Sequence, residues 1–195
     1  MGRSIRCSDP VFDHTELKFV ESPLPGLWLI DIELMEDARG YFARSFCVDE
    51  FRAHGLDPAI AQCNISFNRS AGTLRGLHYQ SSPHEEAKLV RCTHGAIFDV
   101  VVDLRPESAS YLHWYGVELT NENYRMLFIP KGFAHGYQTL TDNSEVFYQM
   151  STFYNAQNAR GVRWDDPGIG INWPLPNPII SEKDRSYPLI GRERA

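Results

Sequence analysis

Hydrophobic and polar residues alternate with a period of two over much of the chain after Gly26. Short runs rich in β-branched and aromatic residues are separated by Gly, Pro, Asn or Ser, as in strands joined by turns. The predicted strands are residues 27–32, 88–91, 96–104, 111–119, 124–129 and 145–154. This spacing predicts an all-β sandwich or barrel, with short helices only at Val48–Ala53 and Glu182–Arg185.

The bulk composition is that of a single globular domain. With 195 residues, 43% of them hydrophobic and 23% charged, the chain can bury a sizeable core. Residues 1–25 lack the strand pattern, so we expect an N-terminal arm attached to a β-domain over residues 26–195. No run reaches the roughly 18 apolar residues of a membrane span, and residues 1–13 lack the apolar stretch of a secretory signal. A cytoplasmic protein without a membrane partner is therefore expected.

Charge and cysteine content narrow the possible ligands. The net charge of −6 argues against broad nucleic-acid binding, which requires a basic surface that releases counterions from phosphates. An anionic small molecule can still bind if a few cations gather in one pocket. The cysteines are scattered and predict neither a disulfide framework nor a structural zinc site; they are Cys7, Cys47, Cys63 and Cys92.

One carboxylate lies in the middle of a predicted strand. Alternation over residues 96–104 places Asp99 on the same face as Ile97 and Val101, among apolar neighbours. A carboxylate in such a place is costly unless it is paired. Asp99 is therefore either a satisfied structural group or part of a functional site, and the pattern alone leaves both interpretations open.

Three segments concentrate polar groups where strand residues are normally apolar. They are residues 62–66, 74–80 and 129–137, which together supply amides, a guanidinium and two imidazoles. If adjacent strands bring them together, they form a polar pocket in an apolar wall, which is the usual form of a small-molecule site.

A metal site is one possible interpretation, because Pro130-x-Gly132-x-x-His135 matches one half of the cupin metal pattern. The other half is missing, since His78 is followed by Tyr79 and Gln80 rather than by a second histidine and a nearby glutamate. His84 and His94 each stand alone. We therefore expect neither a metal nor an organic cofactor.

Without a metal, the same residues suit proton transfer at carbon. A neutral imidazole, with a usual pKa of about 6.5, is a competent base near neutral pH, which suggests His78. Removing a hydrogen next to a ketone also requires a cation or donor for the enolate, and Lys88 stands ten residues further on. Tyr148 offers a phenol as the acid, although a core tyrosine with one satisfied hydroxyl is the alternative interpretation.

Together these segments resemble the dTDP-4-dehydrorhamnose 3,5-epimerase family from about residue 29 to residue 189. Each motif is weak alone, but eight in the family's order are specific. The motifs are D-x-R-G-x-F at 37–42, Q-x-N-x-S at 62–66, LRGLHYQ at 74–80, KLVR at 88–91, DV-x-VDLR at 99–105, IP-x-GFAHG at 129–136, WDDP at 164–167 and S-x-KD at 181–184.

The resemblance implies a double-stranded β-helix, the cupin-like jelly roll, paired as a homodimer through strand exchange. It implies that His78 is the base, with Asp184 orienting its ring, and that Tyr148 is the acid on the other face. Lys88 would lie near the enolate oxygen. His135, paired with Asp99, would line the sugar pocket.

The implied activity is cofactor-independent epimerisation of a nucleotide-linked 4-keto-6-deoxyhexose at C3, C5 or both, in deoxysugar biosynthesis. A single-centre epimerase acting on another nucleotide-linked keto sugar, a metal-dependent cupin and a non-catalytic sugar-nucleotide binder are the alternatives. The nucleotide diphosphate and sugar would be bound by polar side chains of the motifs, namely Arg39, Gln62, Asn64, Arg75, Lys88, His135 and Lys183.

Two positions depart from the family's pattern. Arg44 and Ala159 stand where the family usually has a glutamate. Both changes remove a carboxylate from positions that the resemblance assigns to ligand binding. We therefore expect an altered nucleotide or sugar preference, for example for a CDP- or GDP-linked keto sugar.

Overall fold

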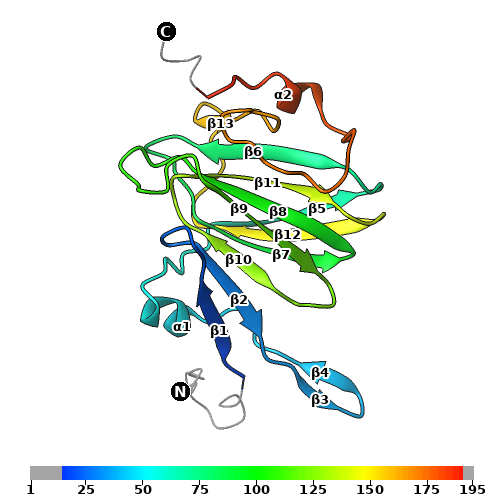
Figure 1. The fold of residues 1–195 in the computed structure, drawn as a ribbon. Helices are drawn as coiled ribbons and strands as arrows, with labels where there is room; N and C mark the ends of the chain where they lie inside the picture. Colours follow the sequence, from blue (N-terminus) through cyan, green and yellow to red (C-terminus); the bar gives the residue numbers. More distant parts are fainter. Residues whose placement is uncertain (1–14, 191–195) are drawn as a thin grey trace.

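The computed structural model describes residues 15–190, which form two antiparallel β-sheets packed face to face (Figure 1). The six-stranded sheet has the order β1 (Leu17–Glu21), β2 (Trp28–Ile32), β10 (Met126–Ile129), β7 (Lys88–His94), β12 (Ser144–Met150), β5 (Gln62–Asn68). The five-stranded sheet has the order β13 (Ala159–Gly161), β6 (Leu74–Gln80), β11 (Phe133–Thr139), β8 (Ala96–Asp103), β9 (Trp114–Thr120). This is the predicted all-β, jelly-roll architecture.

The remaining elements are short. β3 (Met35–Asp37) and β4 (Gly40–Phe42) form a separate hairpin, which projects from the end of β2 away from the two sheets (Figure 1). The two helices, α1 (Val48–Ala53) and α2 (Glu182–Arg185), have the predicted bounds. Helix α2 belongs to the C-terminal segment, which lies beside β6 and β13 (Figure 1).

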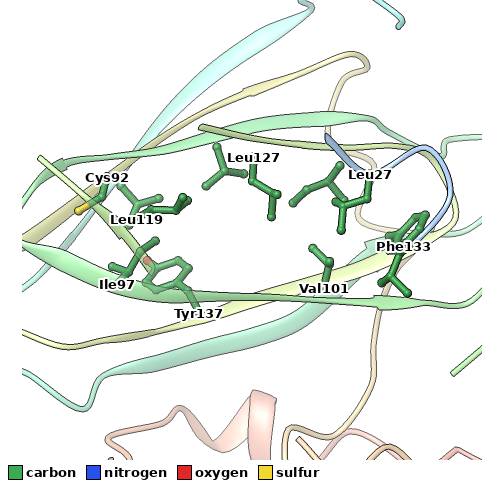
Figure 2. Close-up of a cluster of buried hydrophobic side chains, with 12 residues drawn as sticks. Leu27, Cys92, Ile97, Val101, Leu119, Leu127, Phe133 and Tyr137 are labelled. Atoms are coloured by element: carbon green, nitrogen blue, oxygen red, sulfur yellow. The ribbon is translucent and has the colours of Figure 1, made fainter. Parts of the chain in front are cut away.

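The core fills the space between the sheets. Leu127 on β10 and Val101 on β8 project toward each other, and Phe133 closes one end of the cluster (Figure 2). The other face of β8, with Val100 and Val102, packs on the C-terminal segment. Both faces of β8 are thus buried, and the alternation predicted along this strand is confirmed.

Two predicted strands begin later than expected, where residues with positive φ precede them. The strand predicted from residue 111 begins at Trp114, because Leu112 has a φ of 64°, which lies in the left-handed region and is incompatible with a strand. The strand predicted from residue 124 begins at Met126, and Tyr124 has a φ of 54°. Of the predicted polar segments, residues 62–66 lie within β5, residues 74–80 form β6, and residues 129–137 run from the last residue of β10 into β11.

Part of the N-terminal arm expected over residues 1–25 is a strand in the structure. Residues 17–21, assigned to the arm before residue 26, form β1 and pair along their whole length with β2. Leu17 is buried, and its amide N–H donates to Glu50 of α1 at 2.8 Å. The part of the predicted arm before residue 15 lies outside the described residues.

Two glycines allow β6 and β11 to approach closely. A Cβ atom on Gly76 would lie 2.6 Å from the Cα of Gly136, and one on Gly136 would lie 2.7 Å from the carbonyl oxygen of Arg75. Gly76 also has a φ of 136°, which side chains rarely tolerate. This approach sets His78 on β6 directly opposite His135 on β11.

Candidate active site

A cavity of about 480 Å³ lies between the sheets, a size suited to a small-molecule ligand. The six-stranded sheet lines it with Gln62, Asn64, Ser66, Lys88, Tyr148 and Met150. The five-stranded sheet lines it with Arg75, His78, Tyr79, Gln80, His135, Tyr137, Ala159 and Arg160. Connecting and C-terminal segments complete the lining with Glu86, Tyr154, Lys183, Asp184 and Tyr187.

Nearly every site residue predicted from the sequence lies at this cavity. The residues brought together are His78, Tyr148, Asp184, Lys88, Gln62, Asn64, Arg75, His135 and Lys183. Asp99 lies behind the wall, where it is fully buried against His135. Arg39 is the exception, as described below.

His78 forms a close pair with Asp184. The Nε2 atom of His78 lies 2.8 Å from Oδ1 of Asp184, and the histidine side chain is 42% exposed. Because a carboxylate only accepts hydrogen bonds, Nε2 carries the hydrogen and Nδ1 keeps the lone pair. His78 therefore has an oriented ring with a basic nitrogen, as a general base requires.

The sequence around Asp184 explains why this carboxylate is held in place. Ser181 caps α2, since its hydroxyl accepts the amide N–H of Asp184 at 3.1 Å. The amide N–H of Gly76 donates to the second carboxylate oxygen at 3.3 Å. Burial alone would raise the pKa of Asp184, but the hydrogen bonds with His78, Gly76 and Ser181 hold it below its ordinary value. Asp184 is therefore an anion at neutral pH.

Tyr148 lines the cavity from the opposite sheet. It lies on β12 between Asn64 of β5 and Val90 of β7, whereas His78 lies on β6. Burial raises the pKa of Tyr148, and the positive charge of Arg75 opposes this rise only in part. The phenol is therefore protonated at neutral pH and can act as an acid.

Lys88 is the buried cation of the site. Its Nζ lies 3.1 Å from Oε1 of Glu86 and donates to the carbonyl oxygen of His78 at 3.4 Å. Arg75 and Lys183 add two further positive charges to the lining. The cavity thus gathers the cations that an acidic chain needs to bind an anionic ligand.

A second histidine and aspartate pair lies opposite the first. The Nε2 atom of His135 is 2.8 Å from Oδ1 of Asp99, whose side chain is fully buried. The pairing partly satisfies the carboxylate noted in the middle of this strand. Within residues 15–190, however, Oδ2 of Asp99 has no hydrogen-bond partner.

Comparison with known proteins identifies the family of this chain. The profile of the family described as dTDP-4-dehydrorhamnose 3,5-epimerase matches residues 21–191. The chain belongs to this family. A dTDP-4-dehydrorhamnose 3,5-epimerase from Sinorhizobium fredii is 43% identical over 176 residues, covering 90% of this chain and 90% of that protein. Membership places the chain among the isomerases, as an epimerase.

Solved structures in the dTDP-4-dehydrorhamnose 3,5-epimerase family share the fold. The dTDP-6-deoxy-D-glucose-3,5-epimerase of Legionella pneumophila, in complex with dTDP-4-keto-L-rhamnose, has a TM-score of 0.85 at 34% identity, covering 91% of this chain and 96% of that chain. A 3'-monoepimerase of Streptomyces bikiniensis, in complex with dTDP-quinovose, has a TM-score of 0.81 at 32% identity, covering 86% and 85%. The predicted cupin-like jelly roll is confirmed.

Two residues that the family motifs suggest for ligand binding lie away from the cavity. Arg39 is at the tip of the β3–β4 hairpin, where its side chain is 90% exposed and paired with Asp37. Within this chain Arg39 is outside the cavity lining, because the hairpin points away from the sheets, and its part in ligand binding stays a prediction. Arg44 pairs with Glu50, the residue that also accepts the amide N–H of Leu17, so this arginine links the start of the β-domain to α1.

The second departure from the epimerase pattern, Ala159, does lie in the lining. Its backbone pairs with Gln80 at the edge of the five-stranded sheet, next to Arg160. Ala159 thus presents a methyl group at the cavity edge. Of Arg44 and Ala159, Ala159 is the one that lies in the cavity lining, and an altered ligand preference stays a prediction.

Sequence reasoning missed several residues of the epimerase cavity. The hydroxyl of Tyr137 donates to Ser66 at 2.8 Å and accepts from Asn68 at 3.2 Å, while Nε of Arg75 donates to Asn68 at 2.8 Å. Tyr187 stacks edge-on to His78, with ring centroids 5.8 Å apart. Tyr137 could have been suggested by its motif, because it follows His135 by two positions. Tyr187 lies in none of the sequence motifs.

Within residues 15–190, no group of three or more His, Cys, Asp or Glu side chains could hold a metal ion. No helix in this range is long and apolar enough to span a membrane. Cys47, Cys63 and Cys92 are free thiols, and burial raises the pKa of Cys92 to about 11.

Proposed function

We propose that this enzyme epimerises a dTDP-linked 4-keto-6-deoxyhexose at C3 and C5, using only its own side chains. One observation carries the proposal: an oriented base, His78, and a protonated phenol, Tyr148, line one cavity from opposite sheets. Inversion at carbon requires a proton to leave one face and to return on the other. Two groups on opposite walls meet this requirement.

In the first step, Nδ1 of His78 takes the proton from the carbon beside the ketone. The C–H bonding electrons form the enolate double bond, and the carbonyl electrons move to the oxygen. Lys88, the buried cation beside the His78 carbonyl, stabilises the resulting negative charge. Asp184 stabilises the imidazolium through its bond to Nε2.

In the second step, the phenol of Tyr148 gives its proton to the same carbon from the opposite face, and the ketone re-forms. The tyrosinate then regains a proton from solvent, and His78 releases its own. The 42% exposure of the His78 side chain supports such exchange. Repetition at the other carbon beside the ketone gives the double epimer.

The cations of the cavity suit the nucleotide diphosphate. Arg75 and Lys183 lie in the lining with the amides of Gln62 and Asn64, which can bind phosphate and sugar oxygens. His135 would line the sugar pocket, held by Asp99. The Legionella relative bound to dTDP-4-keto-L-rhamnose supports a dTDP sugar as the ligand.

The decisive experiment is incubation of the protein with dTDP-4-keto-6-deoxyglucose in heavy water, with deuterium at C3 and C5 read by NMR. Deuterium at both carbons is expected. No deuterium at either carbon, with the CDP- and GDP-linked analogues also inert, would overturn the proposal. If an analogue reacts faster than the dTDP sugar, the nucleotide assignment is wrong, and Ala159→Glu then tests the cavity edge.

A single-centre epimerase is the second candidate. The observation in its favour is the likeness to the 3'-monoepimerase of Streptomyces bikiniensis. Deuterium at only one carbon, with the second carbon unlabelled after prolonged incubation, distinguishes this activity from double epimerisation.

We further propose that the enzyme is a cytoplasmic homodimer in which Arg39 of the partner subunit reaches this cavity. The projecting hairpin supports the idea, since Tyr41 and Phe42 are each 52% exposed there. Arg39→Ala and His78→Ala subunits, inactive alone, should regain activity when mixed and reassembled. Absence of complementation, with a monomer in light scattering, would contradict the proposed dimer.

The cytoplasmic location has separate support. Free thiols such as the exposed Cys63 are typical of proteins in a reducing compartment.

A further inference from the structure

A buried carboxylate beside Lys88 has no part in the mechanism above. Glu86 pairs with Lys88 through Oε1, 3.1 Å from Nζ, and the two side chains are 4% and 9% exposed. In residues 15–190, Oε2 of Glu86 has no hydrogen-bond partner. The ion pair with Lys88 thus holds this carboxylate in place.

The backbone around Glu86 is held from both sides. The side-chain amide of Gln80 donates to the carbonyl oxygen of His84 at 2.8 Å. The amide N–H of Ala87 donates to the hydroxyl of Ser151 at 2.8 Å, and the amide of Ser151 donates back to the carbonyl of Ala87 at 3.0 Å. A side chain on such a braced segment has little freedom, so it can fix the position of its partner.

The geometry points to Glu86 as a positioning residue that holds the ammonium of Lys88 at the place where the enolate oxygen forms. An ammonium has three donors. Glu86 and the carbonyl of His78 occupy two of them, and together they aim the third. This inference rests on the proposed function, because it assigns Lys88 to the enolate.

The opposite charges of Glu86 and Lys88 also favour the pair. A buried ammonium without a compensating anion is costly, and so is a buried carboxylate without a cation. The pair therefore keeps a cation in the cavity wall that could otherwise reorient toward solvent. Preorganised charge of this kind accelerates proton removal because it needs no rearrangement as the enolate forms.

The test compares variants that differ only in what they offer the ammonium. Glu86→Met keeps the side-chain volume but removes the acceptor, and it should lower the kcat for deuterium incorporation about thirtyfold, with KM changed by less than about twofold. Glu86→Gln keeps an acceptor oxygen and should lose only about threefold. Glu85→Gln, on the same segment but outside the cavity lining, is the matched control and should match the wild type.

A double-mutant cycle decides whether Glu86 acts through Lys88. In a Lys88→Met background, Glu86→Met should lower kcat by no more than about twofold, because the group it positions is already absent. A packing role would instead give the same thirtyfold loss in both backgrounds, and would overturn the inference. So would wild-type kcat in the Glu86→Met variant.

Folding and function are kept apart by two further measurements. Thermal unfolding of each variant checks the fold, and Glu86→Asp replaces Glu86→Met if the latter does not fold. Aspartate keeps the negative charge but is one methylene shorter, so its carboxylate lies further from the ammonium of Lys88. If Glu86 positions Lys88, kcat should fall about tenfold. Unchanged kcat in that variant overturns the inference. Wild-type and Glu85→Gln proteins that incorporate no deuterium would overturn the proposed function, and this inference with it.

Discussion

His78 and His135 face each other on paired strands, and each has Nε2 2.8 Å from an aspartate oxygen. Their surroundings differ. The His78 side chain is 42% exposed, whereas that of His135 is 11% exposed. Asp184 receives a further backbone hydrogen bond from Gly76, whereas Oδ2 of Asp99 has no partner within the part of the chain that the structure describes.

The difference indicates which histidine can cycle protons. A catalytic base must gain a proton from substrate and release it to solvent, and an exposed ring with a fully bound carboxylate behind it allows both. The ring of His135 is more deeply buried, so solvent has less access to it for proton exchange. The two pairs have similar geometry but different exposure, which is consistent with the proposed roles of His78 as the base and His135 as a wall of the sugar pocket.

The largest expected effect separates the two histidines directly. His78→Ala should lower the rate of deuterium incorporation about ten-thousandfold, because it removes the base itself. His135→Ala should lower kcat/KM about a hundredfold or less, mainly through KM, because it removes a substrate contact. Progress curves at several substrate concentrations measure both constants.

The roles would be reversed if His135→Ala abolished exchange while His78→Ala changed mainly KM. Binding of dTDP by calorimetry serves as the control, since both variants keep Arg75 and Lys183, which are proposed to bind the nucleotide diphosphate.

The next largest loss of activity is expected for Tyr148, which lines the cavity from the sheet opposite both histidines. Tyr148→Phe removes the acid but leaves the base, so inversion should fall about a hundredfold or more while deuterium wash-in at the substrate carbon continues in part. NMR resolves retained and inverted labelled species. Equal loss of wash-in and inversion would contradict the division of labour between the two sheets.

Much of this site could be predicted from local sequence. The alternation in residues 96–104 placed Asp99 in the middle of a strand, and the motifs at 74–80 and 129–136 marked the two strands that carry His78 and His135. Strands with glycine, histidine and amide residues at core positions signal a site, because such residues otherwise weaken packing.

What could not be predicted depends on contacts between distant residues. Glu86 is one of two adjacent glutamates, and the segment that buries it is held in part by the bonds between Ala87 and Ser151, 64 positions apart. Arg39 belongs to a motif, yet the direction of its hairpin is set by tertiary structure. Leu112 gives no local sign of its left-handed backbone.

The carboxylate behind each histidine offers a smaller effect than the ring itself. Asp184→Asn should lower kcat about a hundredfold, because the amide no longer stabilises the imidazolium and can favour the wrong tautomer. Asp99→Asn should leave kcat within about tenfold and act mainly on KM. A larger kcat loss in Asp99→Asn than in Asp184→Asn would break the distinction between the two pairs.

The smallest effect concerns stability in acid. The pKa of Asp184 is below its ordinary value in the folded state, so ionised Asp184 stabilises the fold above the unfolded pKa of about 3.9. That contribution is lost as the pH falls through the lowered folded-state pKa. The stability gap between wild type and Asp184→Asn should therefore be widest near neutral pH and should narrow toward pH 2. Urea unfolding at several pH values measures it, and a gap that widens in acid would mean that folding raises the pKa of Asp184 instead of lowering it.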